Sequence, residues 1–184
     1  MNQKIKLLAG IALIIVLFSC IRTPEDKEKS ISTAKEKTSS PTDLKEINTL
    51  LDSFNVAAAE ANFDKYFSYL TEDAIYIGTD ATENWTKKTY MQWAKPYFDA
   101  KTTWNFESVQ RNVYFGAQED IAWFDELLNT QMKICRGSGV VIKKDNKWKI
   151  QQYVLSMTIP NSQINKVIAV KSAEEDSLLN NIKK

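Results

Sequence analysis

Two stretches in the second half of the chain decide the fold: IAWFDELLNTQ at residues 121–131 and KWKIQQYVLSMT at residues 147–158. Both are rich in aromatic and β-branched residues, which favour β-strands. Two further stretches of the same kind, at residues 104–115 and 135–144, predict two more strands. Segments such as Gly116 to Asp120 supply the hairpin turns. The second half of the chain therefore predicts a run of adjacent antiparallel strands.

The residues before this run have a helical pattern. Asp43 and Glu46 have the spacing of a capping box, in which each side chain bonds a free backbone donor at a helix start. A stripe of apolar residues follows at helical spacing, formed by Leu44, Ile47, Leu50, Leu51, Phe54, Ala57, Ala58 and Ala61. The sequence also predicts a short helix at 63–70, a short strand at 74–78, and a third helix from the cap Thr86 to about Phe98. Helices followed by adjacent strands indicate an α+β fold, with the sheet wrapped over the helices.

The first nineteen residues have the three parts of a secretory signal: a positive start, an apolar run at 7–18 and the small residue Ser19. The run is shorter than the roughly 20 residues of a membrane-spanning helix. The sequence Leu17-Phe18-Ser19-Cys20 resembles the lipobox of bacterial lipoproteins, in which the cysteine is acylated and becomes the new N-terminus. The alternative is an ordinary signal peptide before an unrelated cysteine. We expect lipid on Cys20 to hold the protein on a membrane outside the cytoplasm, in the bacterial cell envelope.

Removal of residues 1–19 leaves 165 of the 184 residues. We divide them into the lipidated cysteine with a flexible tether at 20–42, a folded domain at 43–161, and a polar, partly helical tail at 162–184. The tether is rich in Lys, Glu, Ser and Thr. Removal of the signal also takes away two lysines and changes the formal charge from +1 to −1. The sequence therefore shows no basic excess for binding nucleic acid.

The chain contains no histidine, and this limits its chemistry. It excludes catalytic triads with an imidazole base and the common histidine-containing zinc sites. A general acid or base has to be Asp, Glu, Lys, Tyr or Cys135, the single cysteine of the predicted domain. We expect Cys135 to pack as a small apolar side chain, and we expect neither a metal nor a cofactor.

A series of short motifs runs through residues 57–160. They include Ala57-Ala58-Ala59-Glu60-Ala61-Asn62-Phe63, Leu70-Thr71-Glu72-Asp73-Ala74, Gly78-Thr79-Asp80, Ala122-Trp123-Phe124-Asp125-Glu126-Leu127, Cys135-Arg136-Gly137-Ser138-Gly139 and Gln152-Tyr153. In this order they resemble the SnoaL-like branch of the nuclear transport factor 2-like superfamily. The resemblance implies a cone-shaped fold, in which a curved antiparallel sheet packs on three N-terminal helices around a pocket. Relatives often carry a histidine after the last motif, where this chain has Val154.

Carboxylates in a pocket are the natural acid and base groups of a chain without histidine, because burial raises their pKa toward neutrality. The candidates are Asp80, Glu83, Asp125 and Glu126, of which we favour the last two as the catalytic base. Strand alternation sends Asp125 and Glu126 to opposite faces, so at most one points into the pocket. The alternative is a structural carboxylate paired with Arg136 on the neighbouring strand.

The candidate ligand-binding residues are Tyr76, Asp80, Trp85, Trp123, Arg136 and Tyr153. The aromatic ones could equally be core or pocket wall, and Asp80 could instead stabilise a turn. The resembled family includes isomerases, cyclases, binding proteins and association domains, so it implies a shape and not an activity. We expect a membrane-anchored domain that binds a small, partly apolar molecule. The alternatives are a cofactor-free isomerase, cyclase or hydratase that uses a pocket carboxylate, and a module that forms a homodimer.

Overall fold

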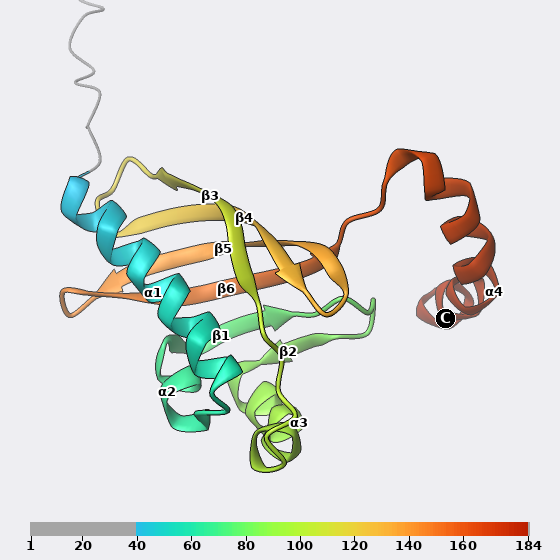
Figure 1. Ribbon diagram of the computed structural model, residues 1–184, viewed down its shortest axis with the longest axis horizontal. Coiled ribbons are helices and arrows are strands. Elements are labelled where there is room, and N and C mark those ends of the chain that lie inside the picture. The colour runs from blue at the N-terminus through green and yellow to red at the C-terminus, as the bar shows by residue number, and fades with distance from the viewer. Residues whose placement is uncertain (1–39, 184) are drawn as a thin grey trace, which may run out of the picture. The chain divides into compact units, whose positions relative to one another are not determined.

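The computed structural model describes residues 40–183 (Figure 1). The predicted signal peptide, Cys20 and nearly all of the predicted tether lie outside these residues. The helices are α1 (Pro41–Ala59), α2 (Phe63–Ser68), α3 (Lys87–Asp99) and α4 (Ile164–Ile182), with the 3-10 turn η2 (Asn161–Gln163) before the last. The strands are β1 (Leu70–Ile77), β2 (Asn84–Thr86), β3 (Glu107–Phe115), β4 (Ile121–Thr130), β5 (Lys133–Lys144) and β6 (Lys147–Met157). None of the described helices is long and apolar enough to cross a membrane.

The six strands of the described chain form one open, curved sheet in the order β2-β1-β6-β5-β4-β3. Strands β3 to β6 pair antiparallel with their neighbours, which confirms the predicted run of strands. Strand β1 pairs with β2 antiparallel but with β6 parallel, so the sheet is mixed and not purely antiparallel as predicted. After β1 the chain passes through β2 and α3 to β3, which lies at the opposite edge of the sheet. The antiparallel strands β3 to β6 then run back across the sheet, and β6 lies beside β1 in the same direction.

The α1 helix crosses one face of this sheet (Figure 1). Its apolar stripe is buried there, with Ile47, Leu51 and Phe54 at most 3% exposed. The buried residues of the sheet, including Phe124, Leu128, Ile150, Tyr153 and Leu155, complete the core. We call the helix-covered side the inner face of the sheet. The opposite side, the outer face, carries the half-exposed Tyr114 and Trp123.

The start of α1 differs from the predicted capping box. The helix begins at Pro41 after Ser40, and the cap makes no side-chain hydrogen bond. The Asp43 carboxylate accepts hydrogen bonds from Lys143 Nζ at 2.6 Å and from Trp148 Nε1 at 2.9 Å instead. The first turn of α1 therefore lies against the β5–β6 hairpin. Lys143 and Trp148 of this hairpin bind Asp43 Oδ1, which in a capping box would accept from the helix backbone.

The remaining elements agree with the sequence except for their lengths and for β2. The α3 helix begins after Thr86, whose side chain accepts a hydrogen bond from Thr89 N as a cap should. Strand β1 begins at Leu70, the predicted end of the short helix, and not at Ala74 as predicted, because Leu70 already lies beside Ile150 of β6. Strand β2 has three residues and was missed. The α4 helix has 19 residues, none of them buried, and takes up most of the tail that was predicted to be only partly helical.

Candidate functional site

A small pocket with aromatic walls lies where the β1–β2 hairpin, α3 and the β4–β5 turn meet. Its volume is about 180 Å³. Twelve residues line it: Tyr76, Gly78, Thr79, Glu83, Trp85, Tyr90, Trp93, Trp104, Phe106, Gln131, Met132 and Leu155. Half of them are aromatic, and three are tryptophans. We refer to this site as the aromatic pocket.

Local features of the sequence bring these rings together. The β1–β2 register places Tyr76 directly opposite Trp85. The cap Thr86 starts α3 so that Tyr90 and Trp93, three residues apart, lie on one side of the helix. The ring of Tyr90 then stacks on Tyr76 with centroids 4.1 Å apart, and Trp93 stacks on Trp85 at 4.7 Å. A three-residue strand and a capped helix are thus enough to build most of the wall.

The tyrosines at and behind the wall are neutral. The hydroxyls of Tyr66 and Tyr90 lie 2.9 Å apart and share a hydrogen bond. Burial raises the pKa of Tyr66, Tyr90 and Tyr153 well above the ordinary tyrosine value. Burial also raises the pKa of Tyr76, and the negative charge of Glu83 adds to this effect. These phenols therefore stay protonated at any physiological pH.

Glu83 is the single charged residue among the twelve that line the pocket. Its Oε2 accepts a hydrogen bond from Asp80 N at 3.1 Å, and its backbone oxygen accepts one from Gly78 N at 2.9 Å. A Cβ on Gly78 would lie 2.1 Å from Glu83 Oε2, so only glycine leaves room for the carboxylate there. The loop between β1 and β2 thus fixes one negative charge at the pocket.

Asp80 supports this loop but does not line the pocket. Its Oδ1 accepts hydrogen bonds from the backbone N of Thr82 at 2.8 Å and from the Thr82 hydroxyl at 2.6 Å. These bonds lower the pKa of the Asp80 carboxyl below its usual value. The geometry is that of a turn held by an aspartate side chain, the alternative raised from the sequence.

Glu126 lies on the inner face, but it is enclosed by protein. Its side chain is fully buried. Arg111 Nε donates a hydrogen bond to Glu126 Oε2 at 2.9 Å, and Nη2 lies 2.8 Å from the same oxygen, although its N–H is not aligned for a hydrogen bond. The Tyr153 hydroxyl donates to Oε1 at 3.1 Å. The ring of Tyr153 stacks on Tyr76, with centroids 5.5 Å apart, so Glu126 lies behind the pocket wall.

The partner of Glu126 is Arg111 and not the Arg136 suggested from the sequence. A bulge between Ser108 and Gln110 leaves Val109 without a partner, and it brings Arg111 directly opposite Glu126. Opposite residues share a face of the sheet, so the guanidinium reaches the carboxylate. Arg111 Nη1 also lies 2.8 Å from Asp52 Oδ1 on α1. The ion pair therefore joins α1 to the sheet.

The other predicted residues lie on the outer face. Asp125 accepts hydrogen bonds from Asn112 Nδ2 and from the Tyr114 hydroxyl, each at 3.2 Å. Trp123 is 48% exposed and stacks on Tyr114. Arg136 pairs with Leu127 across β4 and is exposed. Neither carboxylate of the favoured catalytic pair thus lines the aromatic pocket.

The structure therefore brings three of the predicted candidates into one pocket: Tyr76, Trp85 and the carboxylate of Glu83. Sequence reasoning missed Tyr90, Trp93 and Trp104, although Glu83 was among the candidate carboxylates. The spacing of Tyr90 and Trp93 behind a helix cap was a usable signal for two of the three. Trp104 precedes β3 in an irregular segment, where no periodicity indicates its direction.

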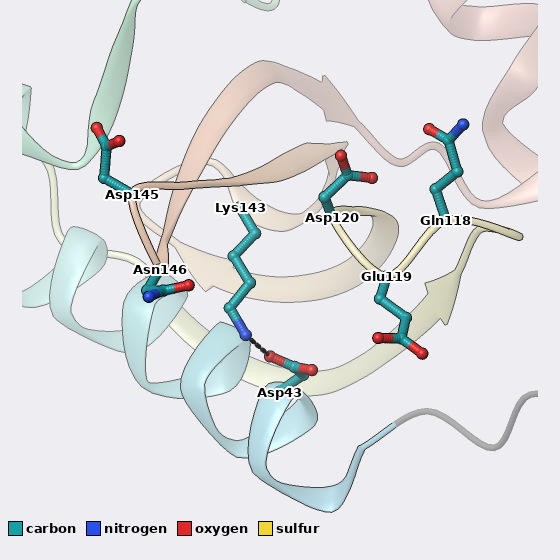
Figure 2. A pocket seen from close by; sticks show the side chains of 7 residues that line it. All are labelled: Asp43, Gln118, Glu119, Asp120, Lys143, Asp145 and Asn146. Atoms are coloured by element: carbon teal, nitrogen blue, oxygen red, sulfur yellow. Dashed lines mark hydrogen bonds and ion pairs between the residues drawn. The ribbon is translucent and has the colours of Figure 1, made fainter.

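A wider polar hollow of about 720 Å³ lies between the start of α1 and two turns of the sheet. Figure 2 shows its seven lining residues, among which Lys143 is the single cation and is bound by Asp43. This ion pair lowers the pKa of Asp43 and raises that of Lys143. Among residues 40–183, no group of three or more acidic or cysteine side chains could hold a metal ion. The hollow has no apolar wall, so the aromatic pocket is the better candidate site.

Comparisons with known proteins identify the family of the chain and solved structures with a similar fold. Residues 47–160 match the family model described as a SnoaL-like domain. A Nostoc punctiforme domain of unknown function with a cystatin-like fold is similar with a TM-score of 0.59 and 15% identity, covering 78% of this chain and 95% of that one. A candidate dehydratase of the NTF2-like family from Streptomyces avermitilis is similar with a TM-score of 0.56 and 12% identity, covering 65% and 98%.

A candidate Ca/calmodulin-dependent kinase II association domain from Exiguobacterium sibiricum has a TM-score of 0.52 and 18% identity, covering 66% of this chain and 97% of that one. No curated protein matches the sequence. At identities this low, the solved structures show a shared fold and no shared activity.

Proposed function

The chain belongs to the SnoaL-like domain family, and from this premise we propose that it binds a small, partly apolar molecule in the aromatic pocket. The size of the pocket supports a small ligand. Its 180 Å³ is below the roughly 300–1,000 Å³ of typical ligand pockets, but a cavity of about 150 Å³ already accepts benzene. The ligand is therefore a small molecule or one end of a larger one.

The composition of the wall supports binding by ring contacts. Three tryptophans, two tyrosines and Phe106 line the site, and the polar side chains among the twelve residues are few. Apolar walls with a small number of placed polar groups are typical of sites that bind small molecules. This combination in one pocket is the observation on which the proposal rests.

The position of Glu126 argues against the catalytic alternative in its original form. A general base has to come within about 2.6–3.2 Å of the proton that it removes. Glu126 is fully buried, bound to Arg111 and absent from the pocket lining. A cofactor-free isomerase, cyclase or hydratase would have to use Glu83, the one carboxylate of the pocket, with Tyr76 as the nearby phenol donor.

Ligand binding can be tested with the three pocket tryptophans as reporters. Native mass spectrometry of protein purified from cells would identify a bound ligand, and intrinsic fluorescence would follow its titration. We expect Trp93→Ala to abolish the fluorescence response. Trp123→Ala is the matched control, because Trp123 is similarly exposed (48% against 39% for Trp93) but lies on the outer face. A response that survives Trp93→Ala and is lost in Trp123→Ala would contradict the proposed site.

We also propose that lipid on Cys20 anchors the protein to a membrane outside the cytoplasm. The lipobox-like sequence behind an apolar run supports this proposal. The test is metabolic labelling with palmitate followed by membrane fractionation. We expect the full chain to incorporate label and sediment with membranes, and Cys20→Ser to lose the label. A labelled Cys20→Ser protein would contradict the anchor.

The outer face supports a third proposal, the association of two copies of the chain. Tyr114 and Trp123 are 45% and 48% exposed, lie opposite each other on neighbouring strands and stack. Exposed aromatic residues on a sheet are typical of interaction surfaces. We expect the purified protein to be a dimer by light scattering and Trp123→Arg to be a monomer. A wild-type protein that is monomeric at high concentration would contradict this proposal.

A further inference from the structure

We propose that the ligand of the aromatic pocket is a small organic cation with an alkylated nitrogen, such as a trimethylammonium group. This inference rests on the proposed binding function and adds the chemical class of the ligand. It follows from three properties of the pocket: its charge, its aromatic wall, and the apolar side chains that complete its lining.

The charge of the pocket favours a cation. Glu83 is the one charged side chain among the twelve lining residues, and no lysine or arginine is among them. The lysine nearest to Glu83 along the chain, Lys87, is buried at the start of α3 and binds Glu72 Oε1 at 2.8 Å and the Leu70 oxygen at 3.3 Å. Lys133 follows the lining residue Met132 but does not itself line the pocket. Among the lining residues, an anionic ligand would therefore meet a carboxylate and no counter-charge, whereas a cation would compensate Glu83.

The aromatic rings present a second attraction for positive charge. The face of an aromatic ring is negative, and it attracts a cation within about 6 Å of its centroid. The centroids of Trp85, Trp93 and Tyr90 lie 4.7–5.9 Å from one another, and Trp104 lies 6.1 Å from Trp93. Trp85, Tyr90 and Trp93 stack on one another, so a cation that lies against this stack is close to more than one ring.

No cation of the protein occupies these rings in the described part of the chain. The two lysines that lie over aromatic rings there are Lys95, over Phe63, and Lys143, over Trp148. Neither Phe63 nor Trp148 lines the pocket. No described lysine or arginine thus lies over a ring of the aromatic pocket.

The hydrogen-bonding capacity of the wall selects an alkylated nitrogen. A primary ammonium carries three N–H donors that need acceptors when they leave water. The side chains of Glu83, Thr79 and Gln131 are acceptors on the lining, with Glu83 Oε2 already bonded to Asp80 N and the Tyr90 hydroxyl shared with Tyr66. Phe106, Met132 and Leu155 offer apolar contact. A nitrogen whose hydrogens are replaced by methyl groups matches this apolar part of the wall, and its charge compensates Glu83.

The test compares choline with 3,3-dimethylbutan-1-ol, its neutral isostere, by isothermal titration calorimetry on the purified full chain. Both molecules have the same shape, so the comparison isolates the charge. We expect choline to bind at least about tenfold more tightly than the alcohol. Equal affinities for the two would overturn the inference, and this comparison requires no mutant.

Variants then identify the source of the preference. We expect Glu83→Gln and Trp93→Leu each to weaken choline binding by about tenfold, while Glu83→Gln leaves the alcohol unchanged. Asp125→Asn and Trp123→Leu are the matched controls on the outer face and should leave both affinities unchanged. A choline affinity that Glu83→Gln leaves unchanged would count against the role of the carboxylate.

The outcomes separate this inference from the proposed function. If the alcohol and a neutral aromatic such as indole bind as well as choline, the pocket binds small apolar molecules and the cation inference fails alone. If choline, the alcohol and indole all fail to bind, the proposed function fails with it. Tetramethylammonium serves as a further probe, because its binding cannot depend on a hydroxyl group.

Discussion

Replacement of Arg111 by methionine is expected to destabilise the domain strongly. The substitution removes both nitrogens that lie within 2.9 Å of Glu126 Oε2 and leaves only the Tyr153 hydroxyl on the other oxygen. Breaking a buried ion pair in this way costs about 3–5 kcal/mol, because an uncompensated charge stays buried. The bond from Arg111 to Asp52 adds less than about 1 kcal/mol, since Asp52 is 63% exposed.

Urea unfolding followed by far-ultraviolet circular dichroism measures this effect. With a slope of about 2 kcal/mol per molar urea, the expected loss lowers the midpoint by roughly 2 M. Asp52→Asn is the control and should lower the free energy of unfolding by less than about 1 kcal/mol. The double variant Arg111→Met, Glu126→Met should recover most of the loss, because no charge remains unpaired. A loss of less than about 1 kcal/mol in Arg111→Met, or a double variant as unstable as the single one, would refute this reasoning.

Three further predictions concern other contacts. Because the bond to Lys143 lowers the pKa of Asp43, its stabilising effect is complete above the unfolded-state pKa and is lost as the pH falls through the folded-state value. The free energy of unfolding should therefore fall more steeply below about pH 4 in the wild type than in Asp43→Asn, as measured by urea titrations at each pH. Gly137→Ala should cost about 1–3 kcal/mol, since the new Cβ would lie 2.5 Å from the Tyr153 hydroxyl, whereas Gly116→Ala, against a movable isoleucine side chain, should cost less in the same assay. Cys135 is fully buried, so a thiol reagent should label a Cys20→Ser chain only as fast as the domain opens, and rapid labelling would contradict the core position.

Local patterns in the sequence were sufficient for most of the fold. The meander from β3 to β6 and the capped α3 helix follow from residue types and from Thr86, which act over a few neighbouring positions. The parallel pairing of β1 with β6 could not be predicted, because it joins residues such as Tyr76 and Tyr153 that no local pattern relates. The capping box at Asp43 was wrong for the same reason, since Lys143 and Trp148 come from a distant hairpin.

The candidate site was less predictable than the fold. Alternation along β4 correctly separates Asp125 from Glu126, but it does not say which of them points inward. The pairing of Glu126 with Arg111 depends on a bulge, and one extra residue in a strand leaves no clear mark on composition. The pocket itself is formed by a loop, a three-residue strand and an irregular segment, which carry little periodic signal. Sequence reasoning therefore named Tyr76, Glu83 and Trp85 among the lining residues and missed Tyr90, Trp93 and Trp104.

The bulge at Val109 has a consequence for the way in which this strand tolerates changes in length. On either side of it, Ser108 lies opposite Leu128 and Gln110 opposite Leu127, so the chain carries one residue more than the pairing uses. Loss of Val109 would produce a regular strand that still places Phe106 at the pocket and Arg111 at Glu126. Loss of a residue between Arg111 and Phe115 would shift one end of the strand to the opposite face. Deletions are therefore expected to be tolerated at one point of β3 and to be disruptive a few residues later.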